Sequence, residues 1–239
     1  MSLQLILATG NENKVREVHE ILAAEHAGAD IRIRSLRSVG IASDPEENGN
    51  SFEENALIKA RAAAAAAALL WEGTPAPGRD RESALHAGRK AWMQVHGMYP
   101  EDVLVFLSDD SGLVIDALGG APGIHSARYL GRDSSYAYKM EHILKELCDV
   151  PEEKRIARFV AAIAAVLPDG TELTARGTMD GVIAREPRGG NGFGYDPILF
   201  LPEFGKTGAE LAPEQKNAVS HRGKGMRRML AMLRERYAV

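Results

Sequence analysis

The chain has 239 residues, a length that suits one large α/β domain or two small lobes that share a core. Hydrophobic residues make up 45% and charged residues 26%, an ordinary composition for a soluble globular protein. The net charge of −4 argues against a protein that binds nucleic-acid polymers, so a bound anion would need local Lys and Arg side chains or helix N-termini.

The single cysteine, Cys148, excludes an intrachain disulfide framework, and its apolar helical surroundings predict a small core residue. The N-terminal stretch MSLQLILATG has no basic region and no cleavage pattern, so we interpret it as a first strand and not as a signal peptide. No apolar run approaches 18 residues, which predicts no membrane association and a cytoplasmic location.

The first half of the chain alternates strand and helix patterns. An apolar strand is expected at 3–8, an amphipathic helix over 14–27 and an alternating strand at 31–36. A helix over 51–71 begins with Ser51 as N-cap and Glu54 three residues later, the pattern of a capping box. Residues 72–102 then change character, with a Pro/Gly loop and one amphipathic helix over 81–97, before a buried strand at 103–108.

The second half predicts a helix over 134–149 and two strands, 155–168 and 171–184, joined by the Asp-Gly turn at 169–170. A long glycine-rich loop follows at 186–197, and a basic amphipathic helix occupies 220–237. The order predicts a mixed α/β fold, a twisted sheet with helices around it.

The stretch TGNENK, residues 9–14, joins the first strand to the first helix. Its glycine permits a tight turn, and the helix that follows offers free N–H groups and Lys14 in its first turn, a geometry that favours phosphate. A turn without a ligand is the alternative interpretation.

The stretch SDDSG places Asp109 and Asp110 side by side at the end of an apolar strand, where two adjacent negative charges repel each other. A hard cation such as Mg²⁺, bound through one or two carboxylates, would resolve the repulsion, whereas a plain Asp-rich turn is the alternative. The acidic loop before residue 51 contains Glu46 and Glu47, which either share that cation or complement a helix dipole. Lys59 faces a phosphate or the solvent.

Two late segments indicate a nucleotide base. The glycine-rich stretch GGNGFGYDP offers the flat faces of Phe193 and Tyr195, and Asp196 can accept hydrogen bonds from a purine edge; a flexible connector is the alternative. The stretch EQKNAVSHRGKG gathers Lys216 and other cations at a helix start, where their interaction with the helix dipole is unfavourable. An anion or a base carbonyl nearby would offset this cost.

Taken together, TGNENK, SFEENALIKA, DDSGLVIDALGGAPGIHSARY, GGNGFGYDPILF, KTGAEL and EQKNAVSHRGKG resemble the inosine triphosphate pyrophosphatase family, from about residue 3 to about residue 235. The resemblance implies an elongated mixed α/β fold with two lobes, a central cleft and a homodimer. It also implies Mg²⁺-dependent hydrolysis of non-standard purine nucleoside triphosphates (ITP, dITP and XTP) to the monophosphate and pyrophosphate.

The family's site residues transfer to matching positions of this chain. Asp110 is implied as the catalytic and metal-binding carboxylate, and Glu46 as the second metal ligand, with Glu47 left open. The implied substrate-binding residues are Thr9, Gly10, Asn11, Glu12, Asn13, Lys14, Lys59, Ser111, Phe193, Gly194, Tyr195, Asp196, Lys216, His221 and Arg222. One departure is plain: the chain is expected to be a single domain over 1–239 with an insertion at about 72–102, which breaks none of these motifs.

Overall fold

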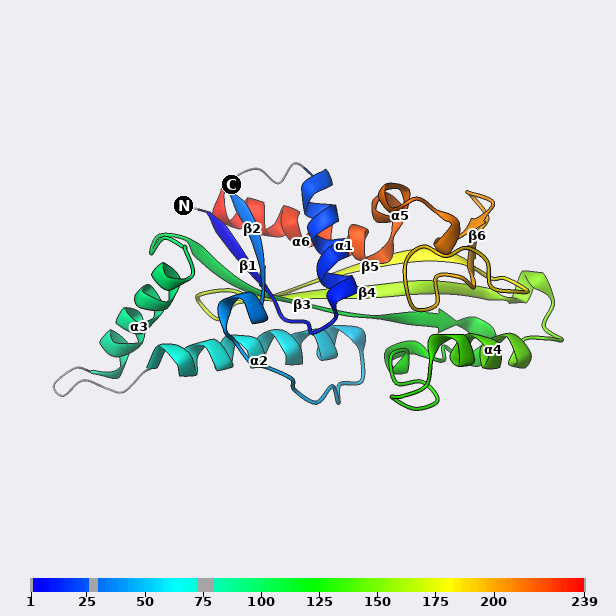
Figure 1. The fold of residues 1–239 in the computed structure, drawn as a ribbon, viewed down its shortest axis with the longest axis horizontal. Helices are drawn as coiled ribbons and strands as arrows, with labels where there is room; N and C mark the ends of the chain where they lie inside the picture. Colours follow the sequence, from blue (N-terminus) through cyan, green and yellow to red (C-terminus); the bar gives the residue numbers. More distant parts are fainter. Residues whose placement is uncertain (1, 26–29, 73–79, 239) are drawn as a thin grey trace.

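The computed structural model describes residues 2–25, 30–72 and 80–238. Their strands form one mixed sheet of seven strands in the order β2-β1-β3-β4-β5-β6-β7. β2, β1 and β3 run parallel, and from β3 to β7 each neighbouring pair is antiparallel. Three long strands, β3, β4 and β5, run along the length of the molecule, with helices on both sides of the sheet (Figure 1).

The strands are β1 (Leu3–Leu7), β2 (Ile31–Ser35), β3 (Val103–Ile115), β4 (Ile156–Val166), β5 (Glu172–Ile183), β6 (Leu199–Leu201) and β7 (Lys206–Thr207). The α-helices are α1 (Glu12–Ala24), α2 (Phe52–Glu72), α3 (Arg81–Val95), α4 (Tyr136–Glu146), α5 (Pro213–Val219) and α6 (His221–Tyr237). None of these helices combines the length and the apolar character that a membrane span requires.

Strand β3 separates its side chains onto two faces because successive residues of a strand point in opposite directions. Val105 and Leu107 pack into the core beneath α1 and α6. Leu104 and Phe106 pack on the other face, in the core that α2 and α3 cover. The same alternation continues toward the middle of the strand and decides where each acidic side chain points.

The buried side chains form separate cores toward the two ends of the long strands. One joins β1, β2, α1 and α6, and another joins α4, β6 and the far ends of β3, β4 and β5. This arrangement confirms the expected elongated α/β fold with two lobes.

The glycine-containing stretch after Asp110 is part of a strand, so the strand end expected at residue 108 is wrong. Asp109 and Asp110 pair with Ile163 and Ala162 of β4, and this ladder keeps the backbone extended to Ile115. Gly112 serves close packing in mid-strand: a Cβ there would lie 2.3 Å from the carbonyl oxygen of Gly123.

Two smaller expectations are also corrected. Ser51 does cap α2 through its hydroxyl, which accepts from the Glu54 N–H at 3.1 Å. The Glu54 carboxylate, however, accepts from the Asn50 N–H at 2.6 Å and not from that of Ser51, so the capping box is displaced by one residue. Cys148 is exposed just after α4 and is not a core residue.

The expected amphipathic helix within residues 72–102 is α3, which packs against α2; residues 73–79 of the expected loop lie outside the described part of the chain. The two helices approach so closely that a Cβ on Gly88 would lie 1.8 Å from the Trp71 carbonyl oxygen. Trp92 packs edge-on against Trp71 at 5.7 Å and donates from Nε1 to the Val39 carbonyl. These contacts make α3 an integral part of the lobe that carries β1.

Candidate functional site

A cleft of about 300 Å³ lies where β1 ends beside β3. β1 pairs with β3 only as far as Leu107, and among the described residues no strand continues along this edge of β3 from Ser108 onward, where only an isolated bridge joins Val114 to Pro122. Ligand sites of α/β proteins occur at such carboxyl ends of strands. Because the edge is open, side chains from both faces of the sheet reach the same cleft.

Most of the expected site residues line this cleft. They are Thr9, Gly10, Asn11, Lys14, Lys59, Asp110, Ser111, Phe193, Gly194, Tyr195, Asp196, Lys216, His221 and Arg222. Glu12, Asn13 and Glu46 are not among its lining residues. Segments from both ends of the sequence therefore meet at one place, as the resemblance implies.

Asp109 is compensated by cations on the α1 and α6 face of the sheet. Its carboxylate forms an ion pair with Lys14 and accepts from Arg222 Nε at 2.9 Å. Burial alone would raise the pKa of Asp109, but Arg222 and Lys14 hold it well below its usual range. The side chain is 1% exposed, and these contacts give it a structural role.

Asp110 lies on the opposite face of the strand, toward α2. It accepts from Lys59 Nζ and from Asn55 Nδ2, each at 3.3 Å. Burial raises the pKa of Asp110, and the negative charges of Glu47 and Asp109 raise it further, against the effect of Lys59. The neighbouring carboxylates thus meet different surroundings, which explains how the chain tolerates both.

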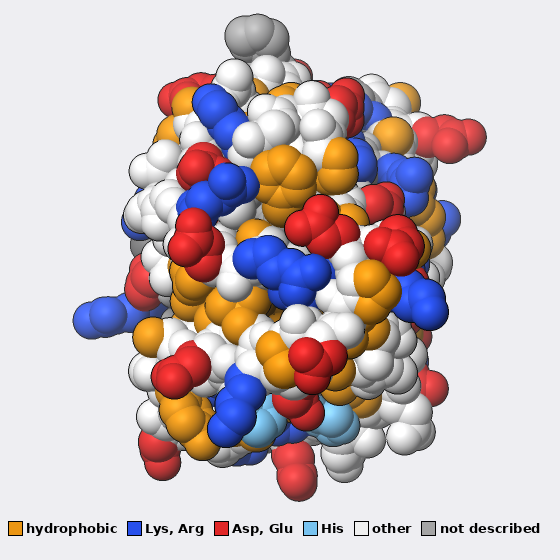
Figure 2. Space-filling view, turned by 90° about the vertical axis from the view of Figure 1, so that its right-hand side faces the viewer, with side chains coloured by type: hydrophobic (Ala, Val, Ile, Leu, Met, Phe, Trp, Pro, Cys, Tyr) orange, Lys and Arg blue, Asp and Glu red, His pale blue; other side chains and the backbone are white. Residues whose placement is uncertain are grey.

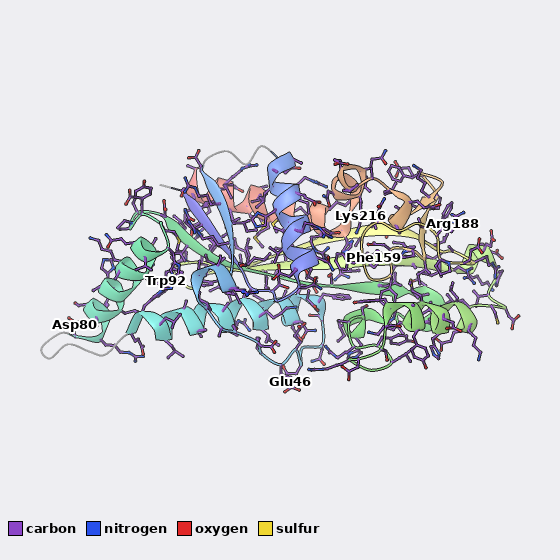
Figure 3. All side chains as sticks on the ribbon, in the orientation of Figure 1. Glu46, Asp80, Trp92, Phe159, Arg188 and Lys216 are labelled. Carbon is purple, nitrogen blue, oxygen red and sulfur yellow. The ribbon has the colours of Figure 1, made fainter. Side chains whose placement is uncertain are left out.

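Glu47, and not Glu46, lies beside Asp110. Lys59 Nζ is 2.9 Å from Glu47 Oε2 and 3.3 Å from Asp110 Oδ1, so two carboxylates converge on one ammonium group. Glu46 is exposed, and Figure 3 shows it at the lower edge of the molecule, away from Phe159 and Lys216. Two carboxylates that already share a cation form a donor set that suits Mg²⁺, which takes one or two carboxylates and completes its shell with water and phosphate oxygens.

The turn at 9–14 is organised as expected for a helix N-terminus. Asn11 caps α1, its Oδ1 accepting from the N–H groups of Asn13 and Lys14 at 3.0 and 3.3 Å. Thr9 Oγ1 accepts from the Asn11 N–H at 3.2 Å. A Cβ on Gly10 would meet nothing within 4 Å, so the space beside the turn is open to a ligand. Glu12 and Asn13 lie in the first turn of α1 but do not line the cleft, and Asn13 Oδ1 accepts from Arg16 Nη2 at 3.1 Å.

The opposite wall of the cleft is an aromatic ring flanked by cations. Lys216 Nζ and the Arg222 guanidinium lie 5.2 and 5.6 Å from the centre of the Phe193 ring. Asp196 accepts from the Phe193 N–H and from Lys216 Nζ, both at 2.7 Å, so its carboxylate is engaged within the protein. Although burial opposes it, the carboxylates of Asp196 and Glu17 raise the pKa of Lys216.

Tyr195 has a different role from Phe193. It is 2% exposed, and its hydroxyl donates to the Ser126 carbonyl at 2.9 Å. Its ring meets Tyr136 edge-on at 5.1 Å. Tyr195 therefore anchors the loop, and Phe193 is the ring that stands partly free.

His221 lies at the start of α6 and stacks on Phe159, with ring centres 4.9 Å apart and an interplanar angle of 18°. Within the described residues its buried Nδ1 has no hydrogen-bond partner. Burial, reinforced by Arg222, lowers the pKa of His221 well below its usual value, so the imidazole is neutral. The neutral ring lines the cleft, where it can hydrogen-bond a ligand.

Several residues of this site carry little signal in the sequence. Phe159, Tyr136 and Arg128 also line the cleft, and Arg128 donates to the Glu47 carbonyl at 3.2 Å. Arg128 belongs to the motif APGIHSARY, which therefore indicated that this segment contributes to the site. Nothing in the local pattern marks Phe159, which sits in an apolar strand, or Tyr136, at the start of α4.

A long mixed sheet with a cleft that combines carboxylates, cations and an aromatic ring defines an α/β protein equipped to bind an anionic ligand with an aromatic part. The model of the Ham1 family matches residues 5–76 and 78–232, and the chain belongs to this family.

Relatives and solved structures agree with this assignment. The chain is 41% identical over 226 residues to a dITP/XTP pyrophosphatase of Geobacillus kaustophilus, covering 95% of this chain and 92% of the relative. It is 40% identical over 233 residues to the dITP/XTP pyrophosphatase of Escherichia coli K12, covering 97% and 98%. The structure of a HAM1 protein from Coxiella burnetii superposes with a TM-score of 0.72 at 34% identity, covering 98% and 99%. The resemblance stated from the motifs is confirmed.

Proposed function

We propose that this protein hydrolyses ITP, dITP and XTP to the nucleoside monophosphate and pyrophosphate and so removes non-standard purines from the nucleotide pool. One observation carries the proposal: a carboxylate pair, a capped helix start, two lysines, and an aromatic ring flanked by cations line a single cleft. The names of the relatives, dITP/XTP pyrophosphatases, support the same substrate class.

We further propose that the enzyme requires Mg²⁺, which Asp110 and Glu47 would hold. When bound, the ion neutralises part of the triphosphate charge. The carboxylates that would hold it already converge on Lys59 Nζ, so the position is one where the protein itself places positive charge.

The residues of the cleft divide the remaining work. Asp110 accepts the proton of the attacking water as the water oxygen bonds to the α-phosphorus and the P–O bond to the leaving pyrophosphate breaks. Lys14, Lys59 and the turn at 9–14 hold the leaving pyrophosphate, because a helix N-terminus and ammonium groups both favour phosphate oxygens. Most of the acceleration then comes from positioning and electrostatic stabilisation.

Selectivity comes from the wall opposite the carboxylates. Hypoxanthine and xanthine carry a carbonyl at position 6, where adenine carries an amino group. An N–H of His221 or Arg222 hydrogen-bonds that carbonyl and is left facing another donor when adenine is present. An unpaired buried donor costs about 1–3 kcal/mol, so two such mismatches give roughly hundredfold discrimination.

The test is a pyrophosphate-release assay with ITP, dITP, XTP, GTP and ATP, each with and without Mg²⁺. We expect Mg²⁺-dependent release that favours ITP, dITP and XTP over ATP by about a hundredfold. Release of orthophosphate alone, or equal turnover of ATP and ITP, would contradict the proposal. A preference for modified pyrimidine nucleotides would support a different pool-cleansing enzyme.

We also propose that the protein acts as a cytoplasmic homodimer, as the family resemblance implies, and that nucleic-acid polymers are not its ligands. On the face shown in Figure 2, basic and acidic side chains are interspersed and form no basic stripe, in keeping with the net charge of −4. Light scattering coupled to size-exclusion chromatography measures the molar mass; a mass near the 25.9 kDa of one chain would contradict the dimer.

A further inference from the structure

Glu17 is a buried carboxylate behind the cleft, and neither the motifs nor the comparisons give it a role. It lies on α1, one turn after Lys14, and is 5% exposed. It is not among the residues that line the cleft. Its Oε1 accepts from Lys216 Nζ at 2.7 Å, and its Oε2 forms an ion pair with Arg222 Nη1. One side chain of α1 thus holds two cations from the far end of the sequence.

These two cations are the ones that flank the Phe193 ring, at 5.2 and 5.6 Å from its centre. Each has a carboxylate of its own: Asp196 for Lys216, and Asp109 for Arg222. Glu17 is the carboxylate that both share. Without its charge the two cations would repel each other across a poorly hydrated space, where such repulsion is strong. Glu17 therefore fixes their separation and hence the edge that they present beside Phe193.

The charges behind this wall balance. Three cations, Lys14, Lys216 and Arg222, meet three carboxylates, Asp109, Asp196 and Glu17. The wall beside Phe193 therefore carries no net charge, which suits a neutral ring. Replacing Glu17 by glutamine keeps the size of the side chain and one acceptor oxygen, turns an amide N–H donor toward the other cation, and leaves one uncompensated positive charge next to the ring.

We propose that Glu17 is a positioning residue that sets the base preference of the cleft by holding Lys216 and Arg222 together and by cancelling their excess charge. This inference rests on the proposed function.

The purine bases offer a direct probe of the charge. The xanthine ring loses a proton near neutral pH and becomes anionic, whereas the hypoxanthine ring stays neutral. An uncompensated positive charge beside the ring therefore favours XTP relative to ITP.

The experiment compares kcat and KM for ITP and XTP in the wild type, Glu17→Gln and Glu20→Gln. Glu20 is a matched control on the next turn of α1, where it accepts from Asn217 Nδ2 at 2.8 Å outside the cleft. We expect Glu17→Gln to lower kcat/KM for ITP about tenfold, mainly through KM, since a charged hydrogen-bonded contact is lost. The ratio of kcat/KM for XTP over ITP rises several-fold, and Glu20→Gln leaves both values unchanged.

A second variant removes a positive charge instead of a negative one, and its result does not depend on whether Glu17→Gln folds. Lys216→Gln leaves one excess negative charge, so the XTP over ITP ratio moves in the opposite direction and falls. An equal loss for both substrates in Glu17→Gln, or a ratio that moves the same way in both variants, overturns the inference while the proposed function stands. A wild type that releases no pyrophosphate from either substrate overturns the proposed function and this inference together.

Discussion

Asp109 and Asp110 are neighbours in one strand, yet we expect opposite outcomes when each is replaced by asparagine. Asp109 is held by Lys14 and Arg222 on one face of the sheet. Asp110 faces Lys59, which keeps a second carboxylate, Glu47, if Asp110 is neutralised. The first substitution leaves buried cations without their partner, whereas the second leaves every cation paired.

The magnitudes follow from these contacts. Removing one partner of a buried ion pair costs about 3–5 kcal/mol, so Asp109→Asn lowers the melting temperature by about 6–20 °C for a chain of this size. Burial and two nearby negative charges raise the pKa of Asp110, so the fold already disfavours its charge. Asp110→Asn therefore changes stability by no more than about 1 kcal/mol, while loss of the proposed general base lowers kcat by about 10²–10⁴.

Differential scanning calorimetry and the ITP assay, run on both variants with the wild type, check this contrast. The expected pattern is a stable and inactive Asp110→Asn beside an unstable Asp109→Asn. Turnover of ITP by Asp110→Asn within tenfold of the wild type would remove Asp110 from the catalytic role. An unchanged melting temperature for Asp109→Asn would refute the reasoning about its buried pairs.

Three further predictions concern the metal, the base and the packing. Glu47→Gln lowers activity and raises the Mg²⁺ concentration needed for half-maximal rate. Glu46→Gln is expected to behave as the wild type in the same Mg²⁺ titration. The reverse result would make Glu46 the metal ligand. Arg222→Lys keeps the positive charge but loses the planar guanidinium with its forked N–H donors. The ratio of kcat/KM for ITP over ATP is expected to fall about tenfold. An unchanged ratio would exclude Arg222 from base recognition. Gly177→Ala places a Cβ 2.1 Å from the backbone of α6 and lowers the free energy of unfolding, measured with urea, by about 1–3 kcal/mol. Gly190→Ala, with open space around it, changes this free energy little. Equal values for the two variants would contradict the packing argument.

Local patterns predicted the elements that local interactions determine. The helix at 134–149 and the hairpin turn at 169–170 were predicted close to their positions in α4 and between β4 and β5. The end of the strand at Asp109 was predicted wrongly because the strand is continued by its pairing with β4, more than 40 positions further along the chain. Aspartate and glycine favour turns when considered alone, and a partner strand overrides that preference.

The outline of the candidate site was predicted because its motifs are distinctive. The prediction was incomplete for residues whose place in the site depends on the fold and not on a motif. Glu46 and Glu47 are adjacent in a loop without periodicity, so only the fold shows which of them reaches Asp110. Phe193 and Tyr195 belong to one motif, yet one ring stands partly free and the other is buried. Glu17 resembles any polar residue of an amphipathic helix until its partner, 199 positions away, is known.

The alternation of β3 gives this site an unusual sensitivity to chain length. Asp109 and Asp110 differ in role only because they point to opposite faces of the sheet, and each face is fixed by the pairing of β3 with β4. A single residue inserted into β3 before Asp109 would turn each carboxylate toward the other's partners. The number of residues between Val103 and Asp110 is therefore as important to this site as the identity of the two carboxylates.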